Sequence, residues 1–227
     1  ADENAGRLGM KGITNSVEDV IVARDILLAK ETGVKLHLCH CSTADSVKMV
    51  EEAKKAGLPV TAEVCPHHFI LTSDDIPGDD GNYKMNPPLR SREDVEELRR
   101  GLKEGIMDVI ATDHAPHGEE EKNQSMKKAP FGIVGLETSA ALTYTELVKP
   151  GTLSILDMAD KMSAGPARIL GLSDKGSVAE GKTADLVVFD PGKCYKIDRE
   201  TFVSKGKNSP FHDREVWGEV SYTLVDG

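Results

Sequence analysis

The sequence predicts an α/β fold in which parallel strands alternate with helices. Two observations predict it: short apolar runs alternate with amphipathic stretches up to about residue 115, and turn residues separate them at short intervals. Short connections on both sides of a crossover helix leave no room for a reversal of direction, so we expect the strands to run parallel. The 227 residues suffice for one large domain, or for one domain with a smaller appendage.

The first helix is predicted over residues 16–33. Ser16 and Asp19 have the spacing of a capping box, and Gly33 provides a stop. Apolar residues at helical spacing predict its buried face, which consists of Val20, Ala23, Ile26 and Leu27. Residues 34–40, with the sequence VKLHLCH, follow as the first strand.

Two similar helix–strand units come next. Their predicted elements are a helix over residues 44–57 capped by Ser42 and Asp45, a strand over 58–64, a helix over 91–105 capped by Ser91 and Asp94, and a strand over 107–112. Helical stretches follow at 135–148 and 153–170. From residue 171 onward, short runs of Val, Leu and Ile between turn residues predict a small β-rich appendage. We therefore expect part of an α/β domain at residues 1–170 and a β-rich part at 171–227.

The composition is that of an ordinary globular protein. The formal net charge of -10 works against binding to the phosphates of nucleic acid. The sequence has no apolar run long enough for a membrane helix and no signal-peptide pattern at its start, so we expect a cytoplasmic protein. In a reducing compartment its four cysteines should be free thiols. These features favour chemistry on a small molecule.

Titratable residues gather at the predicted strand ends. The first strand ends in His40, the second runs into Cys65, His67 and His68, and the third ends in Asp113, His114 and His117. In parallel βα architectures the loops after the strands lie at one edge, where functional groups meet. The sequence therefore predicts a site at this edge. His67 and His68 are adjacent, so in an extended chain only one can face it, and neither is assigned.

His40 and Asp113 are the best candidates for metal ligands. A lone histidine is more often a hydrogen-bonded core residue, and Asp113 would also suit a turn or a helix N-cap. Together, however, an imidazole nitrogen at one strand end and a carboxylate oxygen at another suit zinc. Cys39 and Cys41 flank His40, but alternation along a strand turns both thiols to the opposite face, which disfavours a cysteine-based zinc site.

Several motifs resemble one family of enzymes. They are LCHCST, TAEVCPHHF, YKMNPPLR, IATDHAPH, APFGIVGLET and the closing KNSPF. In this order they resemble bacterial dihydroorotases of the long, type I kind, in the amidohydrolase superfamily. The resemblance implies a (β/α)₈ barrel of the TIM type that binds one or two zinc ions. Its expected activity is the interconversion of N-carbamoyl-L-aspartate and L-dihydroorotate in de novo pyrimidine biosynthesis.

The same resemblance implies roles for individual residues. Asp113 matches the catalytic aspartate, which also binds metal and moves a proton between the attacking water and the leaving nitrogen. His40 matches the metal ligand of the sixth barrel strand. The residues implied in substrate binding are Asn86, His117, Phe131 and Gly132. A histidine can donate to the substrate carboxylate, and an amide side chain can pair with the ring amides.

The chain also departs from the family pattern. It lacks the family's His-x-His motif, the bridging carboxylate and the histidine of the fifth strand. It therefore resembles the C-terminal portion, with strands six to eight and part of a small β-sandwich domain. We expect activity with the N-terminal half present, as a homodimer of the complete enzyme, which could also bind aspartate transcarbamoylase. Two alternatives stay open, a hydantoinase or allantoinase and a non-catalytic scaffold that partners aspartate transcarbamoylase.

Overall fold

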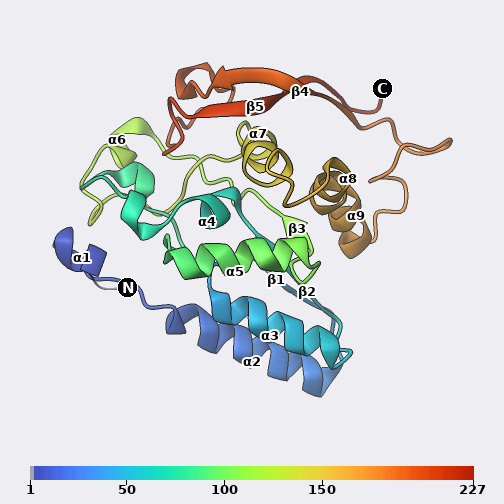
Figure 1. Cartoon of the computed structure of the whole chain (residues 1–227), viewed down its shortest axis with the longest axis horizontal. Helices are drawn as coiled ribbons and strands as arrows, with labels where there is room; N and C mark the ends of the chain where they lie inside the picture. The colour runs from blue at the N-terminus through green and yellow to red at the C-terminus, as the bar shows by residue number, and fades with distance from the viewer. Residues whose placement is uncertain (1–2) are drawn as a thin grey trace.

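A parallel sheet of three strands lies at the centre of the computed structural model, which describes residues 3–227 (Figure 1). The strands are β1 (Leu36–Leu38), β2 (Val60–Val64) and β3 (Val109–Ile110), in the order β1-β2-β3. His37 of β1 pairs with Thr61 of β2, and Glu63 pairs with Val109 of β3. The predicted parallel arrangement is thus confirmed. Each strand is shorter than predicted, because the ends of the apolar runs leave the sheet for the loops.

The two faces of the sheet differ in polarity. Along β2, buried Val60, Ala62 and Val64 alternate with the half-buried Thr61 and Glu63. The three buried residues belong to the main core cluster, together with apolar residues of the helices after β1 and β2. The other face carries polar side chains from neighbouring strands. The alternation thus turns one face to the helices and reserves the second for a polar site.

Three long helices lie side by side next to the sheet (Figure 1). They are α2 (Ser16–Thr32), α3 (Ala44–Lys55) and α5 (Arg92–Lys103). Gly33 ends α2 in the left-handed conformation, with φ of 71°, as predicted. The capping box of Ser91 and Asp94 at the start of α5 is also confirmed.

The predicted caps of the first two helices are wrong. Ser16 lies within α2, and Asp19 accepts a hydrogen bond from the hydroxyl of Thr43 at 2.6 Å. Thr43, rather than Ser42, is the N-cap of α3. Ser42 instead donates through its backbone N–H to Glu18 at 2.8 Å. The carboxylates in the first turn of α2 therefore join it to the start of α3, a long-range role that competes with local capping.

The predicted buried face of α2 is confirmed only in part, because Ala23 and Ile26 are half-buried and Ile26 packs against the core cluster. The structure buries Val22 and Ala29, whereas Val20 and Leu27 are 65% and 64% exposed. The helix has apolar residues on all of its sides, so its sequence does not indicate which side packs against the core. The exposed side forms a stripe of large apolar residues that consists of Val17, Val20, Ile21, Leu27 and Leu28.

The remaining elements are short. Those between β1 and residue 170 are α4 (Pro66–Ile70), η1 (Ser73–Asp75), η2 (Gly81–Tyr83), α6 (Glu119–Lys122), α7 (Ser139–Thr143), η3 (Tyr144–Val148), α8 (Ile155–Ala159), η4 (Asp160–Ala164) and α9 (Gly165–Leu170); α1 (Glu3–Arg7) precedes them all. The two predicted helical stretches after residue 134 are confirmed, and each contains a π-helical segment, η3 or η4.

The C-terminal segment contains an antiparallel pair of strands, β4 (Leu186–Lys196) and β5 (Glu215–Leu224), joined through η5 (Arg199–Thr201). Figure 1 shows the pair, in orange and red, next to α7. Phe211 and Val216 are buried in the same core cluster as the parallel sheet. The segment after residue 170 thus contributes to the central core, and the domain boundary there stays a prediction.

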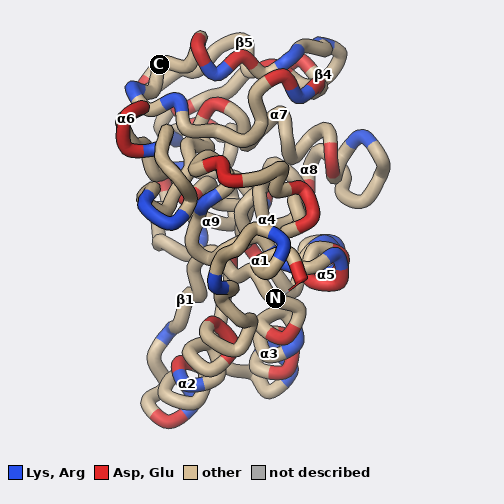
Figure 2. The backbone as a smooth tube through the Cα atoms, turned by 90° about the vertical axis from the view of Figure 1, so that its left-hand side faces the viewer, with Lys and Arg blue, Asp and Glu red and all other residues tan. Residues whose placement is uncertain are grey.

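Charged residues of both signs are interspersed along α2, α3 and α5 (Figure 2). Within residues 3–227, no helix combines the length and the apolar character that crossing a membrane requires.

Candidate active site

His40 and Asp113 lie at the same edge of the sheet, just after β1 and β3. Both have a left-handed backbone, with φ of 39° and 47°. Residues other than glycine adopt this conformation rarely, and such strain concentrates at functional sites. One strand separates β1 from β3, so their ends lie about 10 Å apart and side chains from both can converge. The roles of the two residues as metal ligands stay predictions.

Glu63 lies between them, on β2, and the sequence analysis missed it. Its carboxylate accepts a hydrogen bond from the backbone N–H of His40 at 3.2 Å and lies 3.0 Å from Nε2 of His37. Burial raises the pKa of Glu63, but the hydrogen bonds from His37 and His40 outweigh burial and leave this pKa below its usual value. An ionised Glu63 therefore fixes the strained turn at His40. The alternation of polar and apolar residues in VTAEV was the signal that could have revealed it.

A cysteine lies next to this glutamate. Cys39, His37 and Glu63 each offer a ligand atom, and these atoms lie within 4.8 Å of one another. Burial raises the pKa of the Cys39 thiol, and the charges of Glu63 and Asp113 raise it further. The prediction that the thiols flanking His40 both point away is wrong in its premise, because β1 ends at Leu38 and strand alternation stops there. The edge is thus rich in groups that bind cations.

His67 and His68 are fully buried in α4, so the expectation of an extended chain at these residues is wrong. Nε2 of His68 lies 2.8 Å from the carbonyl oxygen of Pro87. Burial lowers the pKa of His67 well below its usual value and lowers the pKa of His68 to about 4. Both imidazoles are therefore neutral at pH 7.

This burial predicts a loss of stability in mild acid. Because the pKa of His68 is about 4 in the folded state and about 6.5 in the unfolded chain, the unfolded state binds the extra proton. Stability is therefore full above pH 6.5 and falls as the pH falls toward 4, by roughly 3 kcal/mol from this group. The free energy of urea unfolding, measured between pH 7.5 and 5, should show the decline. A His68→Gln variant should decline less steeply, and equal slopes would contradict the assignment.

The predicted substrate residues come from three loops that meet. His117 Nε2 lies 2.9 Å from the carbonyl oxygen of Phe131. The N–H of Gly132 donates to the carbonyl of Lys84 at 3.0 Å, which brings the loop before Asn86 to the same place. The ammonium of Lys84 lies 4.5 Å from the centre of the Phe131 ring, in a cation–π contact. His117, Phe131 and Gly132 are thus brought together, and exposed Asn86 lies two residues from this junction.

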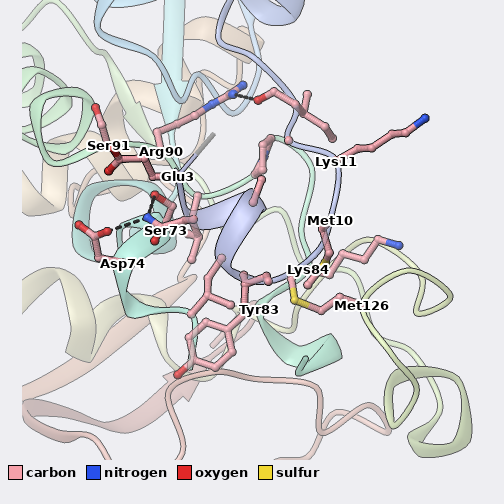
Figure 3. A pocket seen from close by; sticks show the side chains of 18 of the residues that line it. Glu3, Met10, Lys11, Ser73, Asp74, Tyr83, Lys84, Arg90, Ser91 and Met126 are labelled. Atoms are coloured by element: carbon pink, nitrogen blue, oxygen red, sulfur yellow. Dashed lines mark hydrogen bonds between the residues drawn. The ribbon is translucent and has the colours of Figure 1, made fainter. Parts of the chain in front are cut away.

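A hollow of about 1210 Å³ opens beside these loops (Figure 3). Residues of α1 line it, and Figure 3 shows Arg90 on one side and Tyr83 and Met126 on the other. Phe131 lines the hollow, whereas the other predicted site residues lie outside its lining. The guanidinium of Arg90 donates to the carbonyl of Ile13 at 2.8 Å. The hollow therefore borders the loop of Phe131, whereas His40 and Asp113 do not line it.

Comparisons with known proteins identify relatives along the whole chain. The sequence model of the amidohydrolase family matches residues 3–227. A dihydroorotase of Staphylococcus epidermidis is 50% identical over 97% of this chain and 52% of its own length. A dihydroorotase of Pelotomaculum thermopropionicum is 52% identical over 97% of this chain and 51% of its own length. The chain thus spans about half the length of the curated relatives that it matches.

Two solved structures, a dihydropyrimidinase and an L-hydantoinase by name, have a similar fold. A dihydropyrimidinase from Brevibacillus agri has a TM-score of 0.88 and 29% identity, over 94% of this chain and 48% of that one. An L-hydantoinase (dihydropyrimidinase) from Arthrobacter aurescens has a TM-score of 0.87 and 34% identity, over 92% of this chain and 48% of that one. Sequence identity to the dihydroorotases is higher than to either of these structures.

Proposed function

Because the chain belongs to the amidohydrolase family, we propose that it corresponds to the C-terminal portion of a dihydroorotase. In this proposal the complete protein is a (β/α)₈ barrel that interconverts N-carbamoyl-L-aspartate and L-dihydroorotate in pyrimidine biosynthesis. The observation that carries it is the identity of 50% and 52% to dihydroorotases along 97% of the chain. A hydantoinase activity is favoured less, because the hydantoinase and dihydropyrimidinase structures named above share 29% and 34% identity with it.

The residues at the strand ends fit a zinc ion as part of its ligand set. His40 offers an imidazole nitrogen and Asp113 a carboxylate oxygen, which are both common zinc ligands. The carboxylates of Glu63 and Asp113, which raise the pKa of the Cys39 thiol, support this assignment because negative charge favours a bound cation. Zinc, when bound, supplies a polarised carbonyl and a water of lowered pKa. We propose one or two zinc ions, with further ligands from outside these two residues.

Each predicted site residue of this chain then has its own role in ring opening. Asp113 accepts a proton from the attacking water and delivers it to the ring nitrogen that leaves. Asn86 pairs with the ring amides, and His117 donates to the substrate carboxylate. The Phe131 ring and the Gly132 backbone close over the substrate and exclude water. Glu63 holds the backbone turn that presents His40.

A substrate comparison tests the proposal. We expect the purified protein that carries this chain to contain zinc and to open dihydroorotate at least about 100-fold faster than hydantoin or allantoin, because the wrong ring leaves polar groups of the site unpaired. Metal analysis and a spectrophotometric assay on the three rings measure this. Faster turnover of hydantoin or allantoin would favour the alternative of a hydantoinase or allantoinase. A protein without zinc and without turnover would instead be the non-catalytic scaffold. The homodimer, the aspartate transcarbamoylase partner and the cytoplasmic location stay predictions.

A further inference from the structure

Lys122 is a buried lysine whose ammonium binds backbone carbonyls. It is 3% exposed and ends the short helix α6. Its Nζ donates to the carbonyls of Lys84 at 3.1 Å, Pro130 at 3.0 Å and Gly132 at 2.8 Å. All of its N–H donors are therefore used, and they join the loop before Asn86 to the loop of Phe131 and Gly132.

Burial of this charge is expensive, which argues against a role in core packing alone. Burial, together with the nearby charge of Lys84 and partly opposed by Asp80, lowers the pKa of Lys122 to about 8. An apolar side chain of similar length would fill the same space without the cost of desolvating an ammonium. What an apolar side chain could not do is hold the carbonyls of two loops.

Asn208 performs the same task from the C-terminal segment. It is 3% exposed, and its amide donates to the carbonyls of Ala115 at 3.0 Å and Gly132 at 3.1 Å. Its side-chain oxygen accepts from the backbone N–H of His117 at 3.1 Å. The single side chain thus uses both of its donors and its acceptor to join the loop of His117 to the loop of Gly132.

The two side chains meet at one atom. The carbonyl oxygen of Gly132 accepts from Lys122 and from Asn208, so both of its lone pairs are occupied. Every loop that carries a predicted substrate residue is therefore linked to this carbonyl group, either directly or through the side chain of Lys122 or Asn208. Asn208 is 91 positions from His117 and 93 positions from Ala115, its two partners in the loop after β3.

We propose that Lys122 and Asn208 are positioning residues, a loop clasp that fixes the substrate loops without touching the substrate. The proposal rests on the proposed function, because the clasp positions the residues that bind dihydroorotate there. Misplacement of residues that bind the substrate without reacting with it raises KM more than it lowers kcat. Loss of the clasp should therefore weaken substrate binding while the proposed zinc ligands His40 and Asp113, which are not among its hydrogen-bond partners, keep their geometry.

The test uses Lys122→Met and Asn208→Ala in the protein that carries this chain. The matched controls are Lys128→Met and Asn123→Ala, whose side chains are exposed. We expect the KM for dihydroorotate to rise by about 10-fold or more in each test variant, with kcat and zinc content much less affected. The controls should match the wild type. Hydrogen exchange of the amides in residues 113–117 and 130–134 should become faster in the test variants alone.

The outcomes separate the clasp from the proposed function. An unchanged KM, or a loss of activity in proportion to lost zinc or lost folded protein, would overturn the clasp. If the wild type does not turn over dihydroorotate, the proposed function fails, and hydrogen exchange alone then decides about the clasp. Faster exchange in the two loops supports it, and unchanged exchange overturns it. If Lys122→Met does not fold, Asn208→Ala decides by the same two measurements.

Discussion

Replacing Asp113 by Asn should abolish ring opening, with kcat/KM for dihydroorotate at least about 1,000-fold lower than in the wild type. An amide has nearly the shape of a carboxylate, but it cannot accept the proton of the attacking water at neutral pH. It is also a weaker zinc ligand, so zinc content should fall as well. A steady-state assay and metal analysis of the same preparation measure both effects.

The backbone should tolerate this substitution, which makes the result interpretable. Asp113 has φ of 47°, a conformation that Asn adopts more readily than most residues. Asp213→Asn is a matched control, because Asp213 is an exposed aspartate with φ of 63°. It should keep full activity. If Asp113→Asn retained activity within about 3-fold of this control at equal zinc content, Asp113 could not be the proton carrier.

Replacing Gly132 by Ala should be the most damaging change in the substrate loops. A Cβ at this position would lie 2.4 Å from the Cβ of Ala115 and 3.3 Å from Nε2 of His117. The backbone φ of 124° is also strained for any residue with a side chain. We expect a loss of about 2 to 4 kcal/mol in the free energy of unfolding, together with a kcat/KM lower by about 100-fold. Urea unfolding and the dihydroorotate assay test the two effects separately.

A second glycine distinguishes backbone strain from steric contact. Gly151 also has a positive φ, of 83°, but nothing lies within 4 Å of the position that a Cβ would take. Gly151→Ala should therefore cost about 1 kcal/mol from backbone strain and leave activity unchanged. Equal effects of the two substitutions would mean that the contact of Gly132 with Ala115 has no special part in shaping the site.

The sequence was sufficient to predict features that depend on local patterns. Alternation of apolar runs and helical stretches predicted parallel strands, and the position of His40 and Asp113 at strand ends predicted a common edge. The capping box of Ser91 and Asp94 was also predictable, because both partners lie within one turn of helix. Each of these predictions needs residues that are near one another in the chain.

Features that depend on distant partners were not predictable. Asp19 was predicted to form a capping box with Ser16, but Glu18 and Asp19 accept hydrogen bonds from Ser42 and Thr43, 24 residues away. The buried face of α2 could not be predicted, because that helix has apolar residues on all of its sides. Lys122 belonged to an exposed-looking acidic helix, EEEK, and nothing in the sequence indicated that its ammonium would be buried among carbonyls.

The left-handed backbone at positions 40 and 113 restricts how the proposed metal site at this edge could be redesigned. Glycine, asparagine, aspartate and histidine enter this conformation at low cost, whereas a branched side chain is strongly disfavoured there. An engineer who wished to exchange the proposed zinc for a softer or a harder ion would therefore have few ligand types to choose from at these two positions. New ligands are better introduced on the extended strand β2, where Glu63 already faces the same edge.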